Sequence, residues 1–275
     1  MNAVLAVLVP VCNGAKFLRE CLDSILRQDF RDFLLFVCDD GSTDQTPAIL
    51  REYAARDARI HILTNPRNMG IAATRNRLLE AIPENAAFAA WIDADDVMRP
   101  GRLTRQIEFL NTHPAIGGVA SSLEIIDENS RTTGSRHYPE DAGEIRRQLP
   151  LHNVLAQPAM MLRTELIRRV GSYSLSCPVC QDYDYWLRCL EYSDFANLKE
   201  PVLRYRISTT QAKQTKLKLS LRLTLKIQRD YYRRNRLRMP FQAVLRQAAG
   251  YMLLLLPSGW ILTLFKFITY RTAKK

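Results

Sequence analysis

The amino-acid sequence predicts an α/β fold, with a mixed, mainly parallel sheet flanked by helices and a helical region appended at the carboxyl terminus. Short apolar runs alternate with segments of helical periodicity over the first hundred residues. Acidic clusters directly follow two of these runs, at the position where open α/β sheets bind ligands. Near residue 200 the composition changes from almost neutral to strongly basic, which indicates an appended region.

Four buried strands are predicted in the first part of the chain, because four short runs are almost entirely apolar. These runs are residues 4–9, 33–38, 60–64 and 88–92. The first predicted helix has apolar residues at i, i+3, i+4, i+7 and i+8, namely Leu18, Cys21, Leu22, Ile25 and Leu26. Asp44 can cap the second helix, and a third is predicted over 71–82. Such alternation is typical of a parallel sheet.

After residue 100 the alternation is less regular. A helix is predicted near 103–110, a long strand over 116–126, and a polar turn at 128–134. A further strand (158–162), a helix (181–192) and a last strand (202–207) complete the compact part.

The segment 216–227 alternates Leu or Ile with polar residues, which is the period of a strand. Leu, Lys and Arg nevertheless favour a helix, and the run is long for a strand. We therefore expect a helix that is apolar on two sides. One side would pack on the preceding domain and the other on a second apolar partner.

The charge of the chain is concentrated at its end. Residues 199–275 hold 18 Lys and Arg against 2 acids, and the first 198 residues hold 21 against 26. A basic region of this kind favours an anionic partner, either nucleic acid or a membrane surface. The six cysteines show no disulfide framework, and the apolar start lacks the basic residues of a signal peptide, so a cytoplasmic protein is expected. Cys177 and Cys180 have the spacing of a metal or redox pair, but no second pair accompanies them.

The sequence WIDADD (91–96) places three carboxylates at the end of a predicted buried strand. Neighbouring carboxylates repel each other unless a positive charge lies between them. No glycine-rich phosphate loop is present, so phosphates bound here would need a metal held by oxygen ligands. A solvated acidic turn is the simpler alternative.

Six segments occur in the order and spacing of a known family. They are VLVPVCNG, LRECLDSILRQDF, VCDDGSTDQT, NPRNMGIAATRN, WIDADDVMRPGRLTRQ and QDYDYWLR. Over roughly residues 3–208 the chain resembles the family 2 glycosyltransferases, an inverting group with the GT-A fold. The resemblance implies a catalytic domain over 1–208. The charge and the apolar pattern of the following residues predict a basic, amphipathic helical region over 209–275 that associates with membranes or forms oligomers.

The resemblance also implies roles for single residues. Asp40 would pair with the nucleotide base and Pro10 would lie against base and ribose, with Arg75 as a further donor contact. Asp93 would lie near ribose and diphosphate, as the first acid of the DxD motif. Asp95 would ligate a divalent metal, Mn²⁺ or Mg²⁺, and Asp182 would be the catalytic base. Asp182 could instead be only a helix cap, and Asp184 is the competing candidate for the base.

Three positions depart from the family pattern. Cys12 stands where the family usually has Tyr, Gln181 where it often has Glu, and Ser208 where many members have a metal-binding His. The last departure makes the expectation of a metal weaker than that of a nucleotide.

The expected activity is inverting transfer of a hexosyl or N-acetylhexosaminyl group from a nucleotide-diphosphate sugar, most simply a UDP-sugar. The acceptor would be a hydroxyl of a glycan or lipid-linked molecule in cell-envelope polysaccharide or lipopolysaccharide synthesis. Transfer to a polyprenyl phosphate and a catalytically inactive membrane-associated scaffold are alternatives. A nucleic-acid-binding protein is disfavoured, because the first 200 residues are slightly acidic and carry no such motif.

The basic region is expected to hold the protein on the cytoplasmic face of the inner or plasma membrane. Between Arg246 and Lys266 lie 19 uncharged residues, just enough to span a bilayer, but residues 257–259 (Pro-Ser-Gly) break the run. Lying in the interface is therefore favoured over crossing. The alternative is packing on the catalytic domain or on a second copy of the chain.

Overall fold

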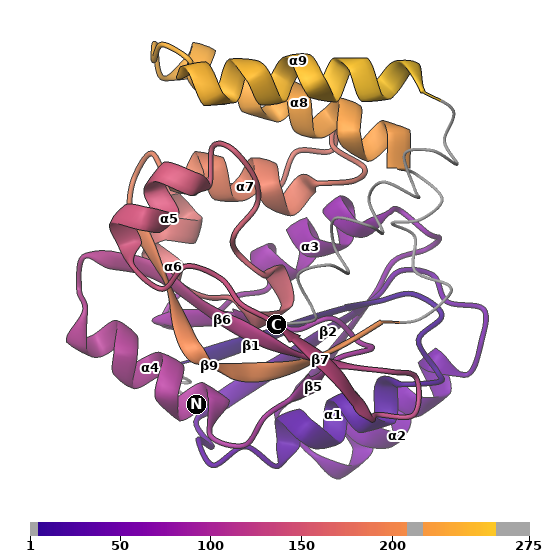
Figure 1. The fold of residues 1–275 in the computed structure, drawn as a ribbon. Helices are drawn as coiled ribbons and strands as arrows, with labels where there is room; N and C mark the ends of the chain where they lie inside the picture. Colours follow the sequence, from indigo (N-terminus) through magenta and orange to yellow (C-terminus); the bar gives the residue numbers. More distant parts are fainter. Residues whose placement is uncertain (1–4, 208–216, 257–275) are drawn as a thin grey trace.

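The structure, a computed structural model, describes residues 5–207 and 217–256. Its strands pair in one sheet of order β3-β2-β1-β4-β8-β6-β9-β5, with β7 beside β6 (Figure 1). The amino-terminal half is parallel: β1 (Leu5–Val11) lies between β2 (Phe33–Asp39) and β4 (Phe88–Trp91), and β3 (Ile60–Thr64) flanks β2. Since parallel strands end at one edge, the loops that follow these strands meet there.

Helices connect these strands and cover the sheet. They are α1 (Leu18–Leu26), α2 (Thr46–Arg56), α3 (Ile71–Glu80) and α4 (Arg102–Thr112). In Figure 1, α1 and α2 lie on one side of the sheet and α3 on the other. Residues 5–9 of β1 are fully buried, as expected for a strand covered on both faces.

The second half of the sheet is mixed. Strand β8 (Met161–Arg163) is antiparallel to β4 and to β6 (Ile116–Ile126), whereas β9 (Asp194–Arg206) is parallel to β6. Strands β5 (Val97–Met98) and β7 (Thr132–Arg136) pair antiparallel with β9 and β6. The helices of this half are α5 (Ala142–Gln148), α6 (Thr164–Val170) and α7 (Gln181–Cys189).

The four predicted amino-terminal strands and the long strand over 116–126 are confirmed. Three predictions were wrong in part. The last strand, expected over 202–207, already begins at Asp194, where β9 pairs with Ile116 of β6. The strand expected over 158–162 begins as a 3₁₀ turn at Gln157–Ala159, because Pro158 cannot donate to a strand ladder. The polar turn expected over 128–134 ends early, since β7 already pairs with β6 from Thr132.

The carboxyl-terminal part forms a helical hairpin of α8 (Leu217–Arg234) and α9 (Phe241–Leu255). The helix predicted over 216–227 is confirmed from Leu217 onward. Helix α8 packs against α7 with one side and against α9 with the other, so its two apolar sides both have partners (Figure 1). A Cβ on Gly250 of α9 would lie 2.7 Å from Leu225 Cδ2 of α8, so the two helices approach closely.

Among residues 5–207 and 217–256, no helix is long and apolar enough to cross a bilayer. Three sequence positions discussed above lie outside the described residues. They are Ser208, the expected domain boundary at 208, and residues 257–259, which were expected to interrupt the apolar run.

Candidate active site

The loops after β1 and β2 are fastened to each other. The Asn13 N–H donates to Ser42 Oγ (2.8 Å), and Asn13 Oδ1 accepts from the Thr43 N–H (2.9 Å). The Gly14 N–H donates to Thr46 Oγ1 (2.9 Å), which ties the same loop to the start of α2. Pro10, near the end of β1, is buried directly before this junction. These hydrogen bonds therefore hold the two loops in a defined position at the carboxyl edge of the sheet.

Asp40 holds the loop that leads into α3. Its carboxylate accepts from Asn65 Nδ2 (2.7 Å), the Met69 N–H (2.8 Å) and the Gly70 N–H (2.9 Å), and the residue is 3% exposed. A carboxylate has about four acceptor positions, so these contacts leave about one for a ligand. The sequence analysis assigned Asp40 to the nucleotide and missed this structural role.

Gly41 allows that loop to approach. Its φ is +67°, and an added Cβ would lie 2.5 Å from the main-chain carbon of Arg67. Both the left-handed backbone and the close approach require glycine. The loop over 65–70 therefore rests directly on the loop after β2.

Arg75 and Asp93 form a partly buried ion pair. Arg75 Nη2 lies 3.2 Å from Asp93 Oδ1, and the side chains are 5% and 33% exposed. The guanidinium carbon lies 5.7 Å from the Trp91 ring centroid and 5.8 Å from that of Tyr173. Arg75 Nε and Nη1 are buried and have no hydrogen-bond partner among the described residues. Buried donors are nearly always paired, so these two nitrogens suit an anionic ligand.

Asp182 lies in the first turn of α7. Its Oδ2 accepts from Asn153 Nδ2 at 3.3 Å. It does not cap α7, which follows Cys180, a residue in the left-handed conformation with no side-chain cap. Asp184 instead pairs with Arg188 one turn later at 3.0 Å. Of the two acids, Asp184 thus has a structural partner of opposite charge.

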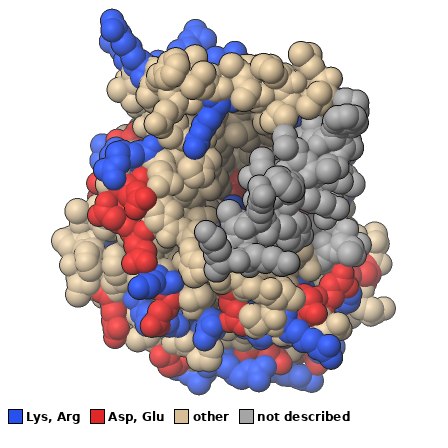
Figure 2. Space-filling model, viewed as in Figure 1, with Lys and Arg blue, Asp and Glu red and all other residues tan. Residues whose placement is uncertain are grey.

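Tyr173 is a buried side chain beside Arg75. Burial raises the pKa of its hydroxyl well above the ordinary value; the charge of Arg75 opposes this rise, and that of Asp182 adds to it. Both charged groups therefore act on one buried aromatic side chain. In Figure 2 the surface is hollowed beneath the α8–α9 hairpin, on the side of the sheet where α7 lies.

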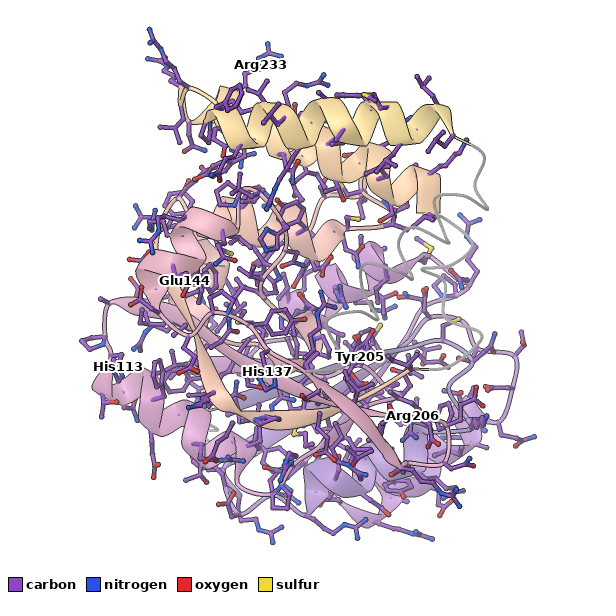
Figure 3. All side chains as sticks on the ribbon, in the orientation of Figure 1. His113, His137, Glu144, Tyr205, Arg206 and Arg233 are labelled. Carbon is purple, nitrogen blue, oxygen red and sulfur yellow. The ribbon has the colours of Figure 1, made fainter. Side chains whose placement is uncertain are left out.

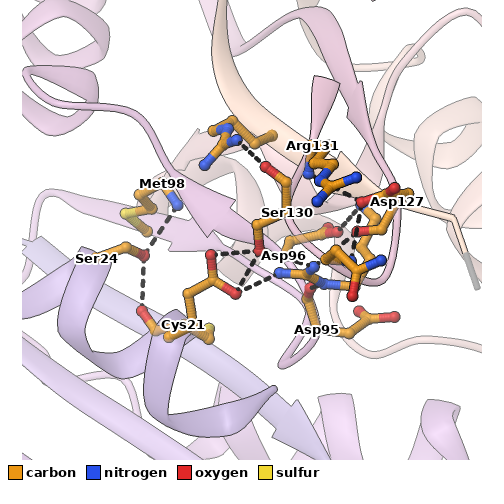
Figure 4. Close-up of polar contacts among 12 residues, drawn as sticks. Cys21, Ser24, Asp95, Asp96, Met98, Asp127, Ser130 and Arg131 are labelled. Carbon is orange, nitrogen blue, oxygen red and sulfur yellow. Dashed lines mark hydrogen bonds and ion pairs between the residues drawn. The ribbon is translucent and has the colours of Figure 1, made fainter. Parts of the chain in front are cut away.

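The acidic turn is held by a residue that the sequence analysis did not single out. Arg206, at the end of β9, is fully buried. Its N–H donates to Asp96 Oδ1 (2.8 Å), and its Nε donates to the main-chain oxygen of Asp95 (2.7 Å). Figure 4 shows this turn beside the segment of Asp127 and Ser130. The signal that could have identified Arg206 is its position two residues before Ser208, in the segment where the family pattern was compared.

Arg206 also reaches two further segments. Its Nη2 pairs with Glu20 of α1 at 2.6 Å, and its Nη1 donates to the Asp127 carbonyl at 2.9 Å. The side chain thereby fixes the acidic turn to α1 and to the turn between β6 and β7. Asp96 is consequently structural, whereas Asp93 and Asp95 are partly exposed.

The donor set of the acidic turn suits a hard divalent cation. Carboxylate oxygens are the ligands preferred by Mg²⁺ and Mn²⁺. Within the described part of the chain, no three His, Cys, Asp or Glu side chains are grouped closely enough to hold a metal. The residues therefore fit a cation that takes one or two carboxylates from the protein and its other ligands from substrate phosphates and water.

The sequence and the fold were compared with known proteins. The family model "Glycosyl transferase family 2" matches residues 6–171. An uncharacterized glycosyltransferase of Methanocaldococcus jannaschii, MJ1057, is 30% identical over 197 residues, which cover 70% of this chain and 66% of the relative. The O-antigen biosynthesis glycosyltransferase WbnJ of Escherichia coli is 27% identical over 219 residues, 78% of this chain and 84% of WbnJ.

Solved structures share the fold. Staphylococcus aureus TarS 1–349 in complex with UDP-GlcNAc aligns with a TM-score of 0.61 and 21% identity, over 81% of this chain and 66% of TarS. The mannosyltransferase PcManGT of Pyrobaculum calidifontis was solved in complex with GDP-Man and Mn²⁺. It aligns with a TM-score of 0.62 and 16% identity, over 98% of this chain and 82% of PcManGT. The chain therefore belongs to glycosyl transferase family 2 and is a glycosyltransferase with the GT-A fold.

Proposed function

We propose that this glycosyltransferase moves a sugar from a nucleotide-diphosphate donor, foremost a UDP-sugar, to a hydroxyl of a glycan or lipid-linked acceptor in cell-envelope polysaccharide synthesis. The observation that carries the proposal is the buried Arg75, which lies beside Asp93 and has two nitrogens with no hydrogen-bond partner in residues 5–207 and 217–256. The names of relatives support it: WbnJ is an O-antigen enzyme, and TarS was solved with UDP-GlcNAc.

Donor binding would use the carboxyl edge of the sheet. The remaining acceptor position of Asp40 can take an N–H of the base, while Pro10 provides an apolar surface beside it. Arg75 would contribute its two free nitrogens to a donor oxygen, which would satisfy these buried groups. Cys12 is exposed at the place where the family usually has Tyr, so the base would have less aromatic surface to stack on.

Asp95 would hold a divalent cation, with Asp93 nearby. When bound, such a cation would neutralise the negative charge that builds up on the departing diphosphate. Asp93 also forms an ion pair with Arg75, so its carboxylate would help to hold the guanidinium in position for the donor. The acidic residues of WIDADD would thus be explained by a cation rather than by a solvated turn.

Asp182 would accept the proton of the attacking acceptor hydroxyl. Its Oδ2 is oriented by Asn153, which leaves the other oxygen available for that proton. The hydroxyl oxygen forms the new bond to the anomeric carbon as the bond to the diphosphate oxygen breaks. A single displacement of this kind inverts the anomeric centre and needs no protein nucleophile.

A panel of nucleotide sugars tests the proposal. We expect a UDP-sugar to raise the melting temperature of the full chain in the presence of Mn²⁺, and less so after EDTA. The product should carry the opposite anomeric configuration to the donor by NMR. If none of UDP-GlcNAc, UDP-glucose, UDP-galactose and GDP-mannose stabilises the protein, the donor assignment is wrong. A retained configuration would refute single displacement.

We further propose that the hairpin rests on an anionic membrane. The buried residues of helix α9 are Ala243, Gln247 and Gly250, which are small or polar. Large apolar residues are exposed instead: Phe241 by 75%, Met252 by 68% and Leu255 by 85%. Residues 233–256 contain five arginines and no acid. Much of the visible hairpin surface in Figure 2 is uncharged, with basic side chains at one end.

An anionic bilayer suits this surface better than a protein partner of mixed charge. The apolar side chains would enter the headgroup region, and each nearby Arg would add about 1 kcal/mol of attraction. A lipid-linked acceptor or a polyprenyl phosphate would be met on the same surface. Figure 3 shows Arg233 on the hairpin, and Arg206 with Tyr205 well apart from it.

A further inference from the structure

Two glutamines are buried where the hairpin meets the catalytic domain. Gln228 of α8 is 7% exposed and Gln247 of α9 is 8% exposed, although Gln is mostly a surface residue. Gln247 Nε2 donates to Gln228 Oε1 at 2.9 Å and to the Leu225 carbonyl at 3.0 Å. Because Oε1 of Gln228 is occupied as an acceptor, its Nε2 is directed away from α9.

The amide of Gln228 joins two segments of the catalytic domain. Its Nε2 donates to the Leu151 carbonyl at 2.8 Å and to the Tyr183 hydroxyl at 3.3 Å. Tyr183 in turn donates to the Leu149 carbonyl at 2.8 Å. Leu151 lies two residues before Asn153, and Tyr183 follows Asp182 directly.

Two more contacts of the hairpin fall on the same two segments. Cys180, two residues before Asp182, lies 3.1 Å by its Sγ from Ser220 Oγ of α8. His152, directly before Asn153, lies 3.1 Å by its Nδ1 from Arg246 Nη1 of α9. The hairpin thus touches both sides of the Asn153–Asp182 hydrogen bond.

We infer that Gln228 is a positioning residue for Asp182, and that the α8–α9 hairpin is a working part of the catalytic centre. Gln228 fixes the distance between α7, which carries Asp182, and the segment that carries Asn153. The inference rests on the proposed role of Asp182 as the base. A general base must lie within hydrogen-bond reach of the proton that it takes, so a small shift of α7 has a large effect on the rate.

The substitution Gln228→Met tests this in the full chain, because Met has a similar length but cannot donate. Lys226→Met is the matched control, since Lys226 lies on the same helix and pairs only with exposed Asp230 among the described residues. We expect faster hydrogen–deuterium exchange over residues 149–156 and in the first turn of α7 for Gln228→Met, with no change for Lys226→Met. Unchanged exchange in both segments would overturn the inference.

The second measurement is the release of UDP from UDP-GlcNAc or UDP-glucose, whichever the panel selects, with Mn²⁺ and water as the acceptor. We expect Gln228→Met to lower kcat about ten- to a hundredfold with an unchanged KM for the donor. In the Asp182→Asn background, Gln228→Met should leave the residual rate unchanged. A further drop there would show a general loss of structure and refute a role through Asp182.

Two outcomes separate this inference from the function on which it rests. If Asp182→Asn keeps the full rate, the base assignment is wrong and the inference falls with it. If Asp182→Asn is inactive while Gln228→Met has the wild-type kcat, only the inference is wrong. Should Gln228→Met fail to fold, Gln247→Met keeps Gln228 in place but frees its amide to rotate, and the same exchange and rate changes are expected in weaker form.

Discussion

The carboxylates of the site differ in what their oxygens already hold. Asp40 and Asp96 are almost fully buried and accept main-chain N–H groups, so they stabilise the loops in which they lie. Asp184 pairs with Arg188. Asp93, Asp95 and Asp182 are only partly buried, and Asp93 and Asp182 contact Arg75 and Asn153. Acids that look equivalent in the sequence therefore differ in burial and in their partners.

The substitution Asp95→Asn should abolish sugar transfer and leave the melting temperature almost unchanged. An amide is a poor ligand for a hard cation, and a partly exposed side chain contributes little to stability. UDP release with Mn²⁺ and thermal unfolding measure the two effects. Asp96→Asn is the matched control and should mainly lower stability, because its buried carboxylate accepts the Arg206 N–H. Full activity of Asp95→Asn, or of the wild type in EDTA, would contradict the metal role.

The substitution Asp182→Asn should lower kcat by about 10²–10⁴, the range typical for loss of a general base, with donor affinity nearly unchanged. Steady-state kinetics and calorimetric titration with the donor measure the two quantities. Asp184→Asn serves as the comparison and should keep most of the rate, since Asp184 is engaged with Arg188. The reverse result would move the base by two residues.

At the scale of elements, the end of β9 holds the acidic turn in place through Arg206. Arg206 joins that turn to α1 and to the segment between β6 and β7. The position of Asp95 therefore depends on a strand that lies more than a hundred residues later in the chain.

The substitution Arg206→Met should lower the free energy of unfolding by about 3 kcal/mol, because it leaves the carbonyl groups of Asp95 and Asp127 without their buried donor. Chemical denaturation measures the change. Arg204→Met, on the same strand but with its side chain 28% exposed, should cost less than about 1 kcal/mol. Equal losses for both variants would argue against a special role of Arg206.

We expect the stability contributed by the contact between Arg246 of α9 and His152 to depend on pH. Burial lowers the pKa of His152 below its ordinary 6.5, and the charges of Arg246 and Arg136 lower it further. Protonation therefore favours the unfolded state, so this contribution is complete above about pH 6.5 and is lost as the pH falls through the folded pKa. His152→Asn should lose less stability than the wild type between pH 7 and pH 5 in denaturation experiments. An identical pH dependence would show that His152 contributes nothing.

At the scale of the whole molecule, charge and exposed apolar surface coincide on the hairpin. The arginines at 233, 234, 236, 238 and 246 accompany an outer face of α9 that is apolar apart from Gln242 and Arg246. The catalytic body carries a small excess of acid instead. This asymmetry would orient the molecule on an anionic surface, with α9 toward the lipid.

The full chain should therefore float with vesicles that contain anionic lipid at low salt, and less with neutral vesicles. The double substitution Leu245→Glu and Met252→Glu should abolish flotation, because it places acids on the outer face of α9. Leu175→Glu is the control, since Leu175 is 68% exposed on the catalytic body. If the wild type ignores anionic vesicles, the face is instead covered by a second copy or by the chain itself, and sedimentation would show which.

The sequence by itself determined the first four strands, the intervening helices and the family. Strand and helix periods are local properties, and the acidic clusters stand directly after the strands that deliver them. A helix over 216–227 could also be predicted, because the helix propensity of Leu, Lys and Arg outweighed the alternating pattern, but its continuation to Arg234 was not predicted.

Only the tertiary structure decided the rest. Strands β5 and β7 are short and exist because β9 and β6 offer them partners. The occupied oxygens of Asp40, the reach of Arg206 to the acidic turn and the two glutamines beneath the hairpin all depend on residues distant in sequence. Such contacts leave no periodic trace, because one buried polar side chain is specified by the groups that surround it and not by its neighbours along the chain.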